Sequence, residues 1–370
     1  MATSYSDTFR MADQLDLFKV DGELVRILPR AGASIRHPDV NLPVLRSDGD
    51  GHYLEIRVDA DPDDASEMSL TRRIPLENLS GEEWEELKEQ YDNIDLESYL
   101  GKGVKGLEKI EDRRIQRLTA ALLTFLNPRQ VSIVFYLYKA AAQQGASPVV
   151  SFRANDLLDA MGYKRTEDGG FPSVTRSKLH RDITALHRTE LVFAQELRKG
   201  DELGAKFTIK SILRIKEFEI DKVPRNFDLD NAADYTYEAA DAYTVSLEFF
   251  DTAAEGDDYV LFGNINMNQR LGSSSKHDYK TKLLVYLASR LQWDKPRDGQ
   301  FLTISKHYLF KNLELFGSNS SRNNTIFWRT VEELQETGYV VGAKQLPGKR
   351  RSVSIEFQIN PEQIRLHSGN

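Results

Sequence analysis

Two stretches of the chain, 148 residues apart, carry side chains that can hydrogen-bond to the edges of nucleic-acid bases. An arginine guanidinium matches the O6 and N7 acceptors of guanine, and an asparagine amide matches the N6 and N7 atoms of adenine. Serine, threonine and lysine can hold bases or phosphates beside them. The predicted contacts are Ser173, Thr175, Arg176, Lys178 and Arg181 in the first stretch, and Ser321, Arg322, Asn323, Asn324, Thr325 and Arg329 in the second.

Both stretches begin a predicted helix, Pro172–Thr189 and Ser321–Thr337, and the two helices align without gaps. Arg181 falls on Arg329 in this alignment. Each arginine lies two residues after an apolar position, which is about 200° around a helix, so it faces away from the apolar side. The aligned apolar positions are Leu179, Ile183 and Leu186 in the first helix and Phe327, Val331 and Leu334 in the second.

The elements around these helices are predicted in the same order twice: helix, short strand, helix, turn, third helix and two strands. In the first copy they are Asn127–Gln144, Val149–Phe152, Ala154–Met161, the third helix, Leu191–Leu197 and Lys206–Ile215. In the second copy they are Asp278–Trp293, Phe301–Ile304, Ser305–Phe316, the third helix, Tyr339–Gln345 and Arg351–Ile359. This order predicts two tandem winged helix-turn-helix domains.

The strands of each copy are predicted to form a hairpin wing whose basic residues neutralise phosphates. These residues are Arg198, Lys199 and Lys206 in the first copy, and Lys344, Lys349, Arg350 and Arg351 in the second. Winged helices also mediate protein contacts, and in that interpretation the same polar side chains are merely solvated.

The chain has 370 residues, and its 49 Lys and Arg against 57 Asp and Glu give a net charge of −8. The charge alternates, with −10 in residues 1–126, +4 in 127–220, −9 in 221–262 and +7 in 263–370. Basic segments favour contact with a polyanion. We predict an α+β fold with an N-terminal acidic α/β segment (1–126), a first winged-helix domain (127–220), an acidic linker or extension (221–262) and a second winged-helix domain (263–370).

The N-terminal segment contains a short apolar motif in a polar surrounding: Gln14, Leu15, Asp16, Leu17 and Phe18. It resembles the bacterial sliding-clamp binding motif, in which a glutamine bonds at a pocket rim and a Leu-Phe pair fills the pocket. The alternative is a β-strand that continues through Ile27. Further along, Glu23–Leu28 and Tyr53–Val58 are predicted strands, and Gly81–Leu100 is a predicted acidic helix with an apolar side.

Several kinds of chemistry are not indicated. The absence of Cys excludes disulfides and cysteine nucleophiles, and no phosphate-binding Gly-x-x-x-x-Gly-Lys-(Ser/Thr) loop occurs. No His-x-His pair is present, and the acidic run Asp59–Asp64 lacks the glycine and glutamate of a calcium loop. We therefore expect no catalytic residue, no cofactor and no metal ion. We expect His180 and His187 to be surface residues or phosphate contacts rather than metal ligands.

Tandem winged helices with a clamp-like motif resemble the iteron-binding plasmid replication initiators. The segment His277–Leu287, a Tyr followed by a basic, leucine-rich helix, is similar to the opening of that family's second module. The resemblance covers residues 127–359 in element order, while the long N-terminal segment and the acidic linker depart from the family. It implies sequence-specific binding to double-stranded DNA with direct repeats at a plasmid origin and opening of adjacent A·T-rich DNA. It also implies recruitment of the sliding clamp and of a replicative helicase or host initiator; a homodimer is a further candidate assembly.

Two other functions stay open at this point. One is a DNA-binding transcriptional regulator or partition adaptor without initiator activity. The other is an enzyme whose site is assembled from distant segments. No apolar run approaches the roughly 18 residues of a membrane span, and no signal-peptide pattern occurs, so we expect a cytoplasmic protein without a membrane partner.

Overall fold

The computed structural model describes residues 18–34, 37–49, 51–60, 69–76, 79–96, 126–145, 147–199, 202–221, 240–250, 259–263, 279–296, 300–317, 319–347 and 353–366. Helices and strands are mixed along the chain, so the fold is α+β, as predicted. The chain divides into two compact units. Unit 1 comprises Met1–Pro29, Pro128–Thr184 and Leu213–Asn370, and unit 2 comprises Arg30–Asn127 and Ala185–Ile212.

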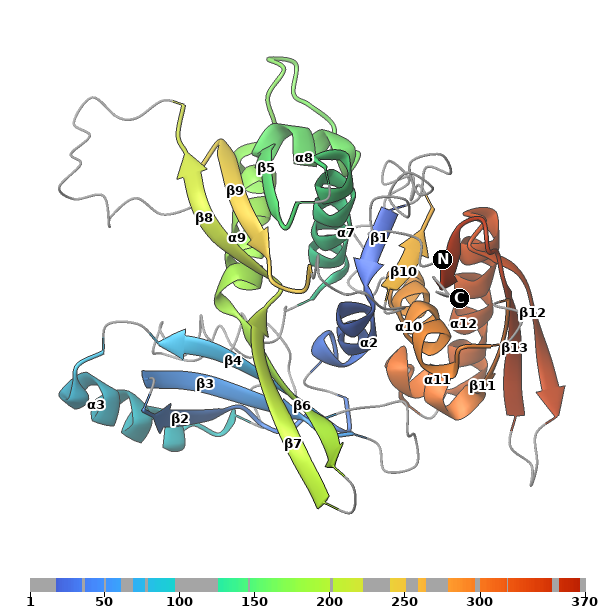
Figure 1. Ribbon diagram of the computed structural model, residues 1–370, viewed down its shortest axis with the longest axis horizontal. Coiled ribbons are helices and arrows are strands. Elements are labelled where there is room, and N and C mark those ends of the chain that lie inside the picture. Colours follow the sequence, from blue (N-terminus) through green and yellow to red (C-terminus); the bar gives the residue numbers. More distant parts are fainter. Residues whose placement is uncertain are drawn as a thin grey trace. The chain divides into compact units, whose positions relative to one another are not determined.

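Module one of unit 1 has three helices and a small antiparallel sheet (Figure 1). The strand order is β5-β9-β8, so the last strand along the chain, β9, lies between the other two. The bounds are Pro128–Gln143 (α7), Val149–Arg153 (β5), Ala154–Ala160 (α8), Ser173–Arg188 (α9), Leu213–Glu219 (β8) and Ala242–Leu247 (β9).

Module two repeats this arrangement with the strand order β11-β13-β12. Again the last strand pairs with both others, which leaves the first and second strands at the edges. The bounds are Tyr279–Asp294 (α10), Phe301–Ser305 (β11), Lys306–Asn312 (α11), Ser320–Glu336 (α12), Val340–Pro347 (β12) and Val353–Ile359 (β13).

The two wings also share a local irregularity. The pairing register shifts by one residue at Lys216 in the middle of β8 and at Val341 near the start of β12. A bulge of this kind places one extra residue outside the ladder and increases the local twist. The equal topology supports the predicted internal duplication, whereas the bulges lie at different places in the two strands.

The predicted wing of module one was wrong. Its two stretches form the hairpin of β6 (Glu190–Lys199) and β7 (Glu202–Ser211), which joins a sheet of unit 2 through pairing of β6 with β4 (Leu70–Leu76). The strands that pair in the module-one sheet after α9 are instead β8 and β9. Within the segment predicted as an acidic linker or extension, β9 belongs to the module-one sheet, whereas Tyr259–Phe262 pairs elsewhere. The β6–β7 hairpin lies between α9 and β8 in the chain.

In its described residues, unit 2 contains a five-stranded antiparallel sheet with the order β2-β3-β4-β6-β7 and a helix between Ser80 and Asn93. The helix, α3 (Gly81–Asp92), begins with a capping box in which the side chains and N–H groups of Ser80 and Glu83 bond reciprocally. It buries Trp84, Leu87 and Tyr91 on its predicted apolar side and ends at Asp92 rather than Leu100. The remaining bounds are Val44–Asp48 (β2) and Gly51–Val58 (β3).

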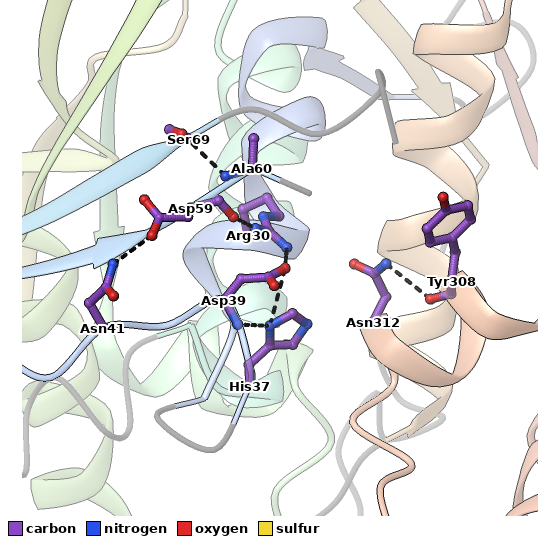
Figure 2. Close-up of polar contacts among 9 residues, drawn as sticks. All are labelled: Arg30, His37, Asp39, Asn41, Asp59, Ala60, Ser69, Tyr308 and Asn312. Atoms are coloured by element: carbon purple, nitrogen blue, oxygen red, sulfur yellow. Dashed lines mark hydrogen bonds and ion pairs between the residues drawn. The ribbon is translucent and has the colours of Figure 1, made fainter. Parts of the chain in front are cut away.

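A buried arginine joins two segments of unit 2 (Figure 2). The Arg30 guanidinium lies 3.0 Å from a carboxylate oxygen of Asp39 and also donates to the backbone carbonyl of Asp59. The side-chain amide of Asn41 donates to the Asp59 carboxylate at 2.8 Å. These contacts fasten the loop after α2 (Gly22–Ala31) to the end of β3.

Helix α2 replaces a predicted strand, Glu23–Leu28. The Asp21 carboxylate accepts hydrogen bonds from the N–H groups of Glu23 at 2.8 Å and Leu24 at 3.1 Å, which caps the helix. A short apolar run has no period long enough to distinguish a strand from a helix. The Asp21 cap favours the helix, and burial of Leu24 and Ile27 adds to it.

Strand β1 (Phe18–Asp21) lies in a sheet with the order β1-β10-β14, together with Tyr259–Phe262 (β10) and Ile364–Leu366 (β14). Phe18 is only 3% exposed and stacks on Phe262, with 5.8 Å between ring centroids. Its ring also lies 6.1 Å from that of Phe135 in α7. The predicted docking role of Phe18 conflicts with this position, because a core side chain cannot also fill a partner's pocket. Gln14–Leu17 lie outside the described residues.

We expect Phe18→Ala to lower the free energy of unfolding by about 3–5 kcal/mol, because it removes a buried aromatic ring and leaves a cavity. Urea denaturation measures this loss. Val341→Ala, at a valine that is 55% exposed, is the control and changes stability by about 0.5 kcal/mol or less. A loss below about 1 kcal/mol for Phe18→Ala would mean that β1 is not docked in solution.

Candidate nucleic-acid interface

Helix α9 buries one side and exposes the other. The buried side is formed by Leu179, Ile183 and Leu186, each at most 1% exposed. Lys178 and Arg181 lie on the opposite side and are exposed. Within the described part of the chain, neither of these two side chains has a hydrogen bond or ion pair. Both cations are therefore available to an external anion. At the start of the helix, Ser173 is exposed and Thr175 is half-buried.

Arg176 has a different environment from the one predicted for a base contact. Its guanidinium forms an ion pair with Asp241 at 2.6 Å and also donates to the carbonyl of Ala240 at 3.4 Å. Burial alone would raise the pKa of Asp241, but the hydrogen bonds from the Asp221 N–H and from Arg176 outweigh it and lower that pKa. Arg176 thus ties α9 to the start of β9 rather than facing outward.

Two further contacts hold α9 in module one. Arg129 of α7 pairs with the buried carboxylate of Asp182. His180 is fully buried, and its Nδ1 lies 2.6 Å from the hydroxyl of Tyr243 in β9. The prediction of a surface histidine was wrong, since this ring is part of the core. Burial, and then the nearby positive charge of Arg176, lower the pKa of His180 to about 4.

Helix α12 exposes a comparable polar side in module two. The Asn319 side chain caps the helix by accepting from the N–H of Arg322 at 2.9 Å. Arg322, Thr325 and Arg329 are exposed along the side opposite the buried Phe327. Arg329 is 78% exposed and lies 3.2 Å from Glu333 one turn later, a contact that orients the guanidinium along the helix.

Asn323 does not lie on this exposed side. It is 9% exposed, and its amide donates to the carbonyl of Leu315 at 3.1 Å, which anchors the turn before α12. Asn324 is half-buried, while Ser321 is exposed. Asn323 therefore faces inward, a position that conflicts with the predicted contact to bases.

The predicted wing cations have three different outcomes. Lys344 in β12 is 66% exposed and pairs across the strands with Glu356 at 2.6 Å. Arg198, Lys199 and Lys206 lie on the β6–β7 hairpin of unit 2, and their side chains are not described. Lys349, Arg350 and Arg351 lie outside the described residues.

Sequence reasoning missed one residue on the exposed side of α9. Val174, in the first turn, is 63% exposed and shares the stripe of Lys178 and Arg181. The spacing alone places Val174 on this side, because it precedes Lys178 by four residues and Arg181 by seven. Val174 was not predicted as a contact because its side chain has no hydrogen-bonding group.

The described residues contain no group of three His, Asp or Glu side chains placed to hold a metal ion. Among the described helices, none combines the length and the apolar character that a membrane crossing requires.

No protein-family model matches the sequence, and no curated protein matches it. Among solved structures, the chain is similar to two crystal structures of domains 2 and 3 of RctB. Selenomethionine derivatives of these domains match with a TM-score of 0.45 and 14% identity over 92% of this chain and 98% of that one. The fragment RctB-155-483 matches with a TM-score of 0.36 and 10% identity over 90% of this chain and 96% of that one.

The buried His180 predicts a loss of stability in mild acid. Its folded pKa lies below the value of about 6.5 expected for an unfolded chain, so the unfolded chain takes up the proton first. Its contribution is complete above pH 6.5 and is lost as the pH falls toward about 4. Urea denaturation across this range should give a steeper decline for the native chain than for His180→Gln, by at most about 1.4 kcal/mol per pH unit. Equal slopes would show that His180 does not titrate differently on folding.

Proposed function

We propose that the chain binds double-stranded DNA sequence-specifically and acts as a replication initiator at a plasmid origin. The observation that carries the DNA-binding part is the equivalence of Arg181 and Arg329. These arginines are exposed at matching positions on the third helices of two modules that share their sheet topology. A chance cluster of surface charge would not repeat at one position of a duplicated fold.

A helix with its side chains is about 10–12 Å across and fits a major groove about 12 Å wide. Winged-helix proteins place the N-terminal part of the third helix against base edges. In module two the charges favour this approach, because Arg322 and Arg329 lie in the first three turns, whereas Glu332 and Glu336 lie exposed near the C-terminus. The acidic end would repel phosphates, so α12 enters by its N-terminal end.

Two modules in one chain suit two successive major grooves, about 34 Å apart on one face of the duplex. The target would then be a site of roughly two helical turns without a need for palindromic symmetry. Directly repeated sites of this kind beside an A·T-rich tract are the DNA that we propose as the origin. The proposal assigns no bond-making step to the chain.

The recruitment part of the proposal is supported by sequence alone. Clamp docking rests on the motif Gln14–Phe18, and it requires Phe18 to leave its core position in β1. Leu17→Ala is therefore a better test of clamp binding than Phe18→Ala, which also removes a core side chain. The second candidate function is a transcriptional regulator or partition adaptor, which shares the DNA contacts; only an initiator would open the adjacent A·T-rich DNA.

We expect DNA affinity to depend steeply on salt. Contact with six phosphates would weaken binding by about 10³-fold between about 50 and 200 mM salt. Replacing Lys178 and Arg181 together by Ala should lower the slope of log affinity against log salt by about two, because two counterions fewer are released. Fluorescence anisotropy measures both effects. Lys88→Ala, at an exposed lysine of α3, should leave the slope unchanged; a flat salt response of the native chain would reject groove binding.

Arg329→Ala should weaken specific binding by about 1–3 kcal/mol if the guanidinium makes a bidentate contact with guanine. The thermal unfolding midpoint should hardly change, because an exposed ion pair within a helix contributes only a few tenths of a kcal/mol. Glu336→Gln, on the same side in the last turn, should keep or raise the affinity. An Arg329→Ala effect within experimental error would remove Arg329 from the contacts.

A further inference from the structure

Val174 is an apolar side chain in the middle of a polar, exposed surface. It is the second residue of α9 and is 63% exposed. Ile183 follows nine residues later, half a turn away around the helix, and is fully buried. Val174 therefore lies on the side of α9 that points directly away from the core of module one.

The free protein gives no reason for a valine at this place. A β-branched residue lowers helix propensity, and an exposed apolar side chain gains no burial energy. Single exposed apolar residues are common on protein surfaces, so exposure alone does not indicate a binding surface. The position of Val174 indicates one, because Lys178 and Arg181 lie on the same side of the helix. In the proposed function these two cations contact DNA.

The major-groove edge of DNA offers one apolar group, the C5 methyl of thymine. A helix that enters the groove by its N-terminal end brings its first turn to the base edges. We propose that Val174 packs against a thymine methyl group, so that module one requires thymine at one position of its half-site. This inference rests on the proposed DNA binding and adds the identity of one base.

Module two differs at this position. The offset of 148 residues places Arg322 where module one has Val174, and Thr325 where module one has Ser177. An arginine side chain hydrogen-bonds to the acceptors of guanine, whereas a valine side chain makes apolar contact with a methyl group. The two halves of each binding site are therefore different in sequence, although the two modules have the same topology.

The test uses the full chain and the tightest-binding duplex that it selects from a randomised pool. Each thymine of this duplex is replaced in turn by deoxyuridine, which keeps base pairing and removes only the methyl group. The native chain should bind about fourfold more weakly at one position, as expected for loss of one buried methyl-sized group. Val174→Ala should lose a similar factor on the unmodified duplex and should then be insensitive to deoxyuridine at that position.

Val341→Ala is the matched control, since it shortens another exposed valine, on the bulge of β12, and should keep the full response to deoxyuridine. The inference is overturned if no deoxyuridine position weakens the native chain, or if Val174→Ala keeps the native response. In both cases the unmodified duplex still binds, so the proposed function survives. Failure to select any duplex would instead reject the proposed function.

Discussion

The third helix of each module can bury only one of its sides, and the assignment of every interface residue follows from which side that is. In α9 the buried side is set by Leu179, Ile183 and Leu186, and in α12 by Phe327, Val331 and Leu334. Because the angle between consecutive residues is fixed at about 100°, burial of these stripes forces Arg181 and Arg329 into solvent. The polar surface is thus a geometric result of core packing.

Local sequence signals predicted much of the fold. Apolar periodicity located all three helices of each module, and the elements follow in the same order in both copies. The offset of 148 residues applies to the third helices only, since the starts of the first helices, Pro128 and Tyr279, are 151 residues apart. The strands of module one were harder, because β6 and β8 both have alternating apolar residues and both follow α9. Tertiary contacts decide which of these two strands joins β5 and β9 in one sheet. A pattern of alternating residues specifies which side of a strand is buried, but it does not specify the strand's partner. The inserted β6–β7 hairpin could not be distinguished from a wing for this reason.

Side-chain assignments failed where chemical type was considered without helical position. Arg176 lies seven residues before Ile183, on the buried side, and there it pairs with Asp241. Asn323 lies four residues before Phe327, which also turns it inward. The same angular arithmetic that placed Arg181 correctly would have excluded both. His180 needed more than arithmetic, because its partner Tyr243 comes from a strand 63 residues away that the sequence had not assigned to module one.

The central place of late strands has a consequence for how the chain matures on the ribosome. Strand β9 separates β5 from β8, so the module-one sheet stays without its middle strand until residues 242–247 have emerged. The pairing of strand β1 is delayed for longer, since its partner β10 is synthesised about 240 residues afterwards. Contacts of such sequence separation form slowly and expose unpaired strand edges meanwhile. Phe18 consequently lacks its partner Phe262 on every nascent chain, for a period set by the rate of translation.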